Sequence, residues 1–183
     1  LAMAAALKGY RAVFTMPDKM SDEKIRVLRA FGAQVVVTPT AVEPDDPRSY
    51  YSVARRIAAE TPGAVLVDQY SHPANPAAHY HTTGPEIWAQ TGGRITHFIF
   101  TIGTGGTITG TGRFLKERNP AVQVVGVDPV GSILHDYFYT GVVTPAHTYA
   151  VEGIGEDFIP SVYGFGVIDD IVQVTDGESF RMA

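Results

Sequence analysis

The sequence contains no cysteine, and this absence removes several kinds of site at once. Disulfide bonds and thiolate-bound metals are excluded, because both need a cysteine sulfur. A chain without cysteine also fits a reducing compartment. We therefore expect the protein to be cytoplasmic.

Long apolar runs and basic clusters are missing as well. No apolar stretch approaches the ~20 residues that a membrane-spanning helix needs. The short apolar segment at residues 1–7 is not preceded by the basic residues of a signal peptide. The formal net charge is −5, and an acidic chain without a basic patch is a poor match for nucleic acid. We expect neither a membrane nor a nucleic acid among the partners.

The most informative stretch that is present is Gly-Thr-Gly-Gly-Thr at residues 103–107. An apolar run at 97–102 predicts a strand before it, and residues 108–118 predict a helix after it. A glycine turn between a strand and a helix aims free backbone N–H groups at an anion, and Thr104 and Thr107 add hydroxyl donors. The stretch predicts a phosphate-binding loop, against the alternative of a tight turn that binds nothing.

Two common phosphate-binding motifs fit this stretch only in part. A Walker loop needs a lysine where Thr111 stands, and the dinucleotide fingerprint needs a glycine where Ile108 stands. Asp128 follows the next predicted strand and could serve as the acid that binds a ribose. A Rossmann-type nucleotide-binding domain therefore stays open as an alternative.

Four further groups of residues accompany the glycine loop, and their order along the chain resembles that of the fold-type II pyridoxal-phosphate (PLP) enzymes. This family includes the tryptophan synthase β subunit, cysteine synthase and cystathionine β-synthase. Tyr70 in place of Phe and Glu152 in place of Gln bring the chain closest to the last of these branches. The groups are Met-Pro-Asp-Lys-Met-Ser at 16–21, Asp-Gln-Tyr at 68–70 with Asn-Pro at 75–76 and Ala-His-Tyr at 78–80, Gly-Val-Asp-Pro at 126–129 with Gly-Ser at 131–132, and Glu-Gly-Ile-Gly at 152–155.

The resemblance implies an α/β fold with two three-layer, parallel-sheet subdomains, as in tryptophan synthase β. Residues 1–68 would belong to a small mobile subdomain, and residues 69–183 to the large PLP-binding subdomain. The chain starts inside a predicted helix and stops shortly after the capping box Thr-Asp-Gly-Glu at 175–178. We therefore interpret it as an interior fragment of a longer protein.

Local patterns give the expected elements within these subdomains. We expect the stretch 69–78 to be a crossing between the subdomains and the stretch 131–160 to be irregular, because both are rich in turn-forming residues. Strands are predicted at 12–16, 34–38, 64–67, 97–102, 122–127 and 171–174, and further helices at 21–31, 50–60 and 83–90.

The resemblance also implies a chemistry. Serine, or an activated serine, would be joined to a thiol by PLP-dependent β-replacement, with homocysteine as the thiol or, in a cysteine synthase, sulfide. These small amino-acid substrates would be the partners of a homodimer. Cofactor contacts would come from Gly103, Thr104, Gly105, Gly106, Thr107, Gly153 and Ile154, and substrate contacts from Gln69, Tyr70, Glu152 and Gly155.

The lysine that forms the Schiff base with PLP in this family has no counterpart here. The chain has only Lys8, Lys19, Lys24 and Lys116, and we expect Lys116 to lie on an exposed helix face. We therefore expect no catalytic residue in this chain and no activity from it alone. Besides a PLP-dependent enzyme and a Rossmann-type domain, a non-catalytic remnant of an enzyme is a third possibility.

Three histidines, His72, His79 and His81, lie close together in the sequence. Their spacings of seven, nine and two residues do not match the i, i+4 pair that places two metal ligands on one helix face. We therefore expect no metal site, and we expect His79 to be a packed, hydrogen-bonded residue.

Overall fold

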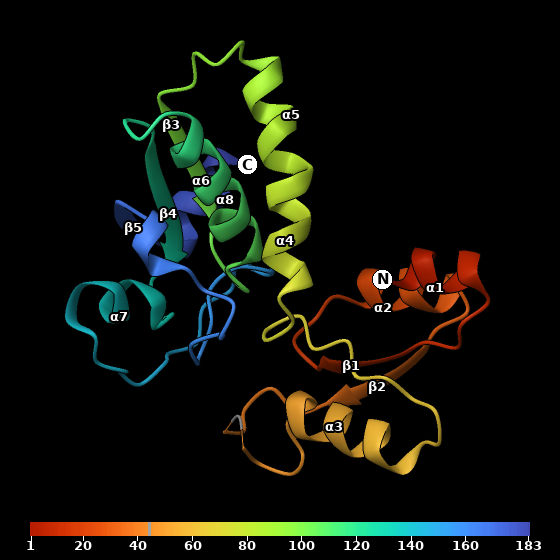
Figure 1. The fold of residues 1–183 in the computed structure, drawn as a ribbon. Coiled ribbons are helices and arrows are strands. Elements are labelled where there is room, and N and C mark those ends of the chain that lie inside the picture. Colours follow the sequence, from red (N-terminus) through yellow and green to blue (C-terminus); the bar gives the residue numbers. More distant parts are fainter. Residues whose placement is uncertain (44) are drawn as a thin grey trace. The chain divides into compact units, whose positions relative to one another are not determined.

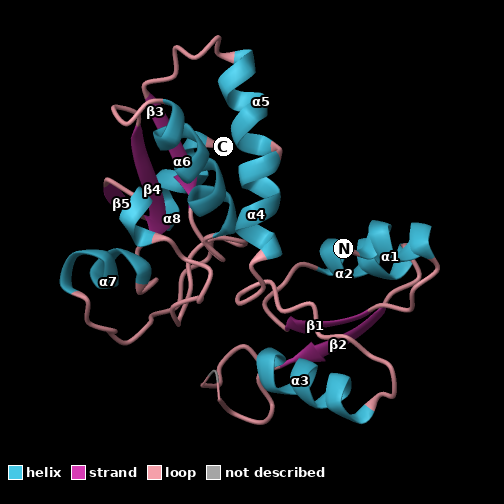
Figure 2. Cartoon of the chain, in the orientation of Figure 1, coloured by secondary structure: helices cyan, strands magenta, loops and turns pink. Residues whose placement is uncertain are grey.

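The computed structural model describes residues 1–43 and 45–183, and the chain divides into two compact units, Leu1–Leu66 and Val67–Ala183 (Figure 1). Helices alternate with parallel strands in both units (Figure 2), which confirms the predicted α/β class. Their roles as a mobile and a PLP-binding subdomain remain predictions. No helix in the described residues has the length and apolar character needed to cross a membrane.

The first unit is built on two parallel strands. Val13 pairs with Gln34 and Pro17 with Thr38, so β1 and β2 run side by side in register. Ile25 of α2 is buried in this unit. The elements are α1 (Ala2–Lys8), β1 (Val13–Pro17), α2 (Asp22–Ala30), β2 (Gln34–Thr38) and α3 (Tyr50–Glu60).

The third strand predicted at residues 64–67 is absent from this unit. These residues pair with no strand in the described chain, and Val65 is 83% exposed. A run of β-branched residues fits a strand only where a neighbouring strand offers hydrogen bonds and a packed face. The prediction was wrong because the local sequence does not show whether such a neighbour exists.

The second unit holds a three-stranded parallel sheet in the order β3-β4-β5. Phe98 of β3 pairs with Val124 of β4, and Gly126 of β4 pairs with Ile171 of β5. The elements are α4 (Ala74–His81), α5 (Thr83–Gln90), β3 (His97–Thr101), α6 (Gly106–Arg118), β4 (Gln123–Pro129), α7 (Leu134–Thr140), the 3-10 helix η1 (Phe165–Val167), β5 (Asp170–Val174) and α8 (Asp176–Met182).

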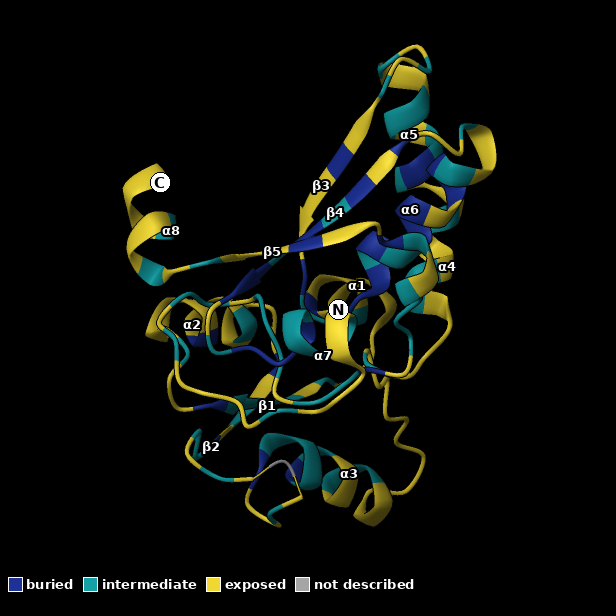
Figure 3. Cartoon of the chain, turned by 90° about the vertical axis from the view of Figure 1, so that its left-hand side faces the viewer, coloured by how far each residue is buried: buried dark blue, intermediate teal, exposed yellow. Residues whose placement is uncertain are grey.

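The core of the second unit lies between this sheet and α6. Ile108 and Leu115 of α6 are almost fully buried, as are Val124 of β4 and Ile171 of β5. Figure 3 shows buried residues gathered along β4 and α6. The glycine loop therefore leaves a strand and enters a helix that are both held by the same core, which fixes its position.

Two segments that we expected to be irregular contain helices. α4 begins at Ala74, inside the stretch 69–78, and Pro76 sits in its first turn, where a missing N–H costs little. α7 lies inside the stretch 131–160. Its start is anchored by a contact with β4, because the backbone N–H of His135 donates to the Asp128 carboxylate at 3.0 Å. Buried Leu134 adds packing.

Lys116 does not lie on an exposed helix face, contrary to our expectation. Its ammonium group is 2.7 Å from the Asp169 carboxylate and donates to the Val122 carbonyl at 3.1 Å. Asp169 also accepts the backbone N–H of Val124 at 2.7 Å. The lysine thus ties the end of α6 to β4 and to the chain that enters β5.

Candidate functional site

The glycine loop joins β3 to α6 in the order that the sequence predicted. Gly105 is the N-cap of α6 and has φ +85°, a left-handed conformation that glycine adopts without strain. The bond from the Thr109 N–H to the Gly105 carbonyl, 3.0 Å, is the first of the helix. Within the described residues, no side chain caps this helix. The N–H groups of its first turn are therefore available to an anion.

A pocket of about 240 Å³ opens beside this loop. Gly103, Thr104, Gly105 and Thr107 form one side of it. Its lining contains hydroxyl groups, backbone amides and a glutamine side chain, and no carboxylate among the described residues. The donors at the start of α6 suit a phosphate group, since the helix dipole adds about half a positive charge there. The residues present therefore fit the phosphate of PLP.

At Gly105 and Gly106, neighbouring protein atoms leave no room for a side chain. A Cβ on Gly105 would lie 2.5 Å from the Tyr163 ring, and one on Gly106 would overlap the side-chain oxygen of Asn75. Gly103 is different, because its nearest neighbour would be the Gly153 carbonyl at 3.5 Å. Of these three glycines, only Gly103 has free space beside its Cα that a ligand could occupy.

The segment 152–155 is anchored next to the loop by a hydrogen bond of 2.7 Å from the Gly155 N–H to the Ile102 carbonyl. A Cβ on Gly155 would lie 2.5 Å from the hydroxyl of Tyr149, so protein atoms occupy the space beside this glycine as well. Gly153 has φ +88° and lines the pocket. Ile154 instead lines a separate hollow beside Val174 of β5.

The predicted substrate residues are brought together only in part. Gln69 lines the pocket with the glycine loop, whereas Tyr70, Glu152 and Gly155 are not among its lining residues. The Tyr70 ring packs edge-on against Phe158, with ring centres 5.0 Å apart. The predicted contacts of all these residues with substrate and cofactor stay predictions.

Asn75 joins Gln69 to the glycine loop, and sequence reasoning gave it no role. Its side-chain amide donates to the Gln69 carbonyl at 2.9 Å and to the Thr104 hydroxyl at 3.3 Å. Asp68, just before Gln69, has φ +38°, in the left-handed region that Asp tolerates better than most residues. The only indication in the sequence that Asn75 belongs to the site was its position within one of the stretches that resemble the PLP family.

His79 is a packed, hydrogen-bonded residue, as predicted. It is half-buried, and its two ring nitrogens lie 2.9 Å from the Thr83 hydroxyl and 3.1 Å from the Thr107 hydroxyl. Across the described chain, no group of three or more His, Cys, Asp or Glu residues is placed to hold a metal ion.

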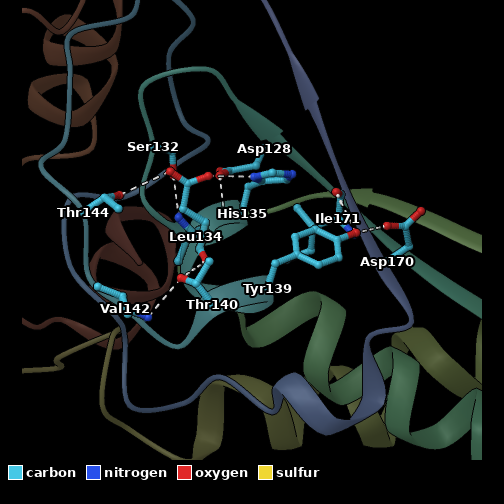
Figure 4. A network of polar contacts seen from close by, with 11 residues as sticks. Asp128, Ser132, Leu134, His135, Tyr139, Thr140, Val142, Thr144, Asp170 and Ile171 are labelled. Atoms are coloured by element: carbon cyan, nitrogen blue, oxygen red, sulfur yellow. Dashed lines mark hydrogen bonds and ion pairs between the residues drawn. The ribbon is translucent and has the colours of Figure 1, made fainter.

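Asp128 is fully buried at the end of β4, in the network that Figure 4 shows between β4 and α7. One carboxylate oxygen accepts the His135 N–H at 3.0 Å. Burial raises the pKa of Asp128 to about 6, and the nearby Ser132 hydroxyl and the His135 N–H lower it less. A carboxylate that is buried and hydrogen-bonded within its own chain is not accessible to a ribose. Asp128 is therefore unsuited to be the ribose-binding acid that the Rossmann-type alternative requires.

We expect Asp128→Asn to stabilise the protein above pH 6. The folded-state pKa is raised from 3.8 to about 6, so the folded protein holds this proton more tightly than the unfolded chain. The contribution of Asp128 to stability therefore falls as pH rises from about 4 to about 6, by about 3 kcal/mol in all. Asparagine does not titrate, and its carbonyl oxygen keeps the bond from His135.

The measurement is urea unfolding of the wild type and the variant at several pH values between 4 and 8. The difference between the two free energies of unfolding should grow in favour of the variant across the pH window from about 4 to about 6. Parallel pH profiles would show that the pKa of Asp128 is not raised in the folded protein relative to the unfolded chain.

Comparison with known proteins covers the whole chain. A family model described as "Pyridoxal-phosphate dependent enzyme" matches residues 1–183. The cystathionine beta-synthases of Apis mellifera and Oryctolagus cuniculus are 46% and 49% identical to the chain over 183 residues, which are 100% of the chain but 36% and 33% of those proteins. The cysteine synthase B of Pseudomonas aeruginosa is 39% identical over 183 residues, 98% of the chain and 54% of that protein. The chain thus spans about a third of the length of these cystathionine beta-synthases.

Proposed function

The chain belongs to the family of pyridoxal-phosphate dependent enzymes, and from this we propose that the full-length protein is a PLP-dependent β-replacement enzyme. It joins serine, or an activated serine, to homocysteine, which places it in transsulfuration. The observation that carries this proposal is the identity of 46% and 49% to two cystathionine beta-synthases across the entire chain. The glycine loop, with its uncapped helix start, supplies a site for the cofactor phosphate.

Within this proposal, the chain contributes binding and orientation. The N–H groups at the start of α6 and the hydroxyls of Thr104 and Thr107 hold the phosphate. Gln69 lines the same pocket and orients the substrate carboxylate, and Asn75 holds the Gln69 backbone in place. PLP supplies the electron withdrawal when it is bound. None of the four lysines of this chain serves as the attachment point, and Lys116 is already paired with Asp169.

Cysteine synthase is the second candidate, and the 39% identity to cysteine synthase B favours keeping it. The two candidates differ in the thiol that they use as second substrate. Homocysteine carries an ammonium group, and hydrosulfide does not. Glu152 brings a negative charge to the segment that lies next to the loop. An exposed charge pair contributes only about 0–1 kcal/mol, so most discrimination has to come from the shape of the pocket.

We expect the full-length enzyme to prefer homocysteine to sulfide. The measurement is kcat/KM for both thiols, each with serine and with O-acetylserine, on purified full-length protein loaded with PLP. The proposal predicts the highest value for serine with homocysteine. A value about tenfold higher for O-acetylserine with sulfide would make cysteine synthase the correct assignment.

We also propose that the full-length enzyme is a cytoplasmic homodimer. The family resemblance supports the dimer, and the lack of cysteine supports the reducing compartment. Light scattering of the purified protein and fractionation of the cells that produce it address the two statements separately.

A further inference from the structure

The imidazole of His79 links two threonine hydroxyls that come from different helices. His79 lies near the end of α4, Thr83 is the first residue of α5, and Thr107 is the second residue of α6. Nδ1 of His79 is 2.9 Å from Thr83 Oγ1, and Nε2 is 3.1 Å from Thr107 Oγ1. Thr107 also lines the pocket beside the glycine loop. The imidazole therefore reaches one of the hydroxyl donors of the candidate phosphate site.

Each of these hydrogen bonds has a direction, and the two directions are linked through the tautomer of the ring. A neutral imidazole has one N–H donor and one nitrogen acceptor, and a hydroxyl has a single hydrogen to give. Burial lowers the pKa of His79, which favours the neutral ring. In the part of the chain that the structure describes, Nδ1 is the only hydrogen-bond partner of the Thr83 hydroxyl. The Thr107 hydroxyl likewise has Nε2 as its only partner there, so these two contacts alone fit either tautomer. A phosphate oxygen beside Thr107 would accept the Thr107 hydrogen, and this favours the tautomer in which Thr83 donates to Nδ1 and the ring hydrogen sits on Nε2.

The hydrogen on Nε2 decides what Thr107 can do. Nε2–H donates to Thr107 Oγ1, so the hydroxyl hydrogen of Thr107 is left for another acceptor. With the hydrogen on Nδ1 instead, Thr107 would donate to His79 and turn its lone pairs toward the pocket. An oxygen lone pair repels a phosphate oxygen, whereas a hydroxyl donor forms a charge-assisted hydrogen bond with it.

We propose that His79 is a positioning residue that holds the Thr107 hydroxyl as a donor to the phosphate of PLP, with Thr83 fixing the ring tautomer. The inference rests on the proposed function, because it needs a phosphate in this pocket. It adds a chain of three side chains, Thr83 to His79 to Thr107, that orients one donor of the site.

Close packing keeps His79 in reach of Thr107. A Cβ on Gly110 of α6 would overlap the Pro76 carbonyl oxygen and would lie 3.0 Å from the Cβ of His79. The backbones of α4 and α6 therefore touch at this point, without side chains between them. The ring of His79 is held over the first turn of α6, which is where Thr107 stands.

The tautomer can be read directly in the full-length protein. Nitrogen-15 NMR of the histidine rings, with and without bound PLP, should show the His79 hydrogen on Nε2, and Thr83→Val should weaken this preference. Thr82→Val is the matched control, because the Thr82 hydroxyl donates to the Ala78 carbonyl at 2.8 Å, whereas the described partners of the His79 ring are Thr83 and Thr107. A hydrogen on Nδ1 in the wild type would overturn the inference without any variant.

A double-mutant cycle tests the action through Thr107. We measure PLP dissociation constants, and the phosphorus-31 shift of bound PLP, for His79→Asn, Thr107→Val and the double variant of the full-length protein. Each single variant should weaken PLP binding about tenfold, which corresponds to the loss of one hydrogen bond to a charged group. In the Thr107→Val background, His79→Asn should weaken PLP binding hardly any further.

The outcomes separate the two proposals. If wild-type protein binds PLP but His79→Asn weakens binding equally in both backgrounds, His79 acts by packing alone and the inference fails. The inference also fails if His79→Asn binds PLP as the wild type does. If the wild type does not bind PLP at all, the proposed function fails and the inference falls with it.

Discussion

Gly105→Val is expected to abolish the retention of PLP by the full-length protein. The backbone of Gly105 has φ +85°, which a β-branched residue adopts only with strain. A Cβ at this position would also lie 2.5 to 2.7 Å from three atoms of the Tyr163 ring. Either the ring or the loop has to move, and a moved loop no longer aims its N–H groups at the phosphate. Cofactor content after gel filtration, read from the visible absorbance of PLP, measures the loss.

Gly141→Val is the matched control for backbone strain. Gly141 has φ +69°, but a Cβ there would meet no atom within 4 Å. This variant carries a similar strain of about 1–3 kcal/mol and should keep its PLP. Full PLP occupancy in the Gly105→Val protein would mean that the phosphate is not bound at this loop.

Gly110→Val is expected to unfold the second unit, or to destabilise it by more than about 4 kcal/mol. The new Cβ would overlap the backbone carbonyl oxygen of Pro76, which cannot rotate away as a flexible side chain can. Helix propensity alone predicts the opposite sign, because valine is a better helix former than glycine by a few tenths of a kcal/mol. Circular dichroism and urea unfolding measure the effect.

Gly177→Val provides the comparison for this second variant. Gly177 lies in α8, and a Cβ at this position would meet nothing within 4 Å. The variant should be neutral or slightly stabilised. If Gly110→Val and Gly177→Val unfold at the same urea concentration, the close contact of α4 and α6 does not hold the unit together.

The features that could be predicted from the sequence are those with local causes. The strand, glycine turn and helix around residues 103–107 follow one another within a short stretch, and each has its own residue pattern. The capping box at Thr175 is complete within four residues, and both of its hydrogen bonds are present in the structure. The glycine that ends α1, Gly9, has φ +71°, as a C-cap glycine should.

The features that could not be predicted depend on residues far apart in the sequence. α7 begins next to Ile133, whose N–H donates to the Glu156 carbonyl, far along the chain, at 3.1 Å. The role of Gly105 depends on Tyr163, and that of Gly106 on Asn75. His79 and Thr107 are 28 residues apart, and only the packing of α4 on α6 brings them together. Composition and periodicity contain no information about such pairs.

The amide of Asn75 has a consequence for engineering the pocket beside the glycine loop. One side chain binds both the backbone carbonyl of Gln69, which lines the pocket, and the hydroxyl of Thr104 in the glycine loop. Libraries that randomise position 69 alone would therefore explore side chains on a backbone whose placement is set elsewhere. We therefore expect substitutions at positions 69, 75 and 104 to be coupled, and a library that varies the three together samples combinations that single-site libraries miss.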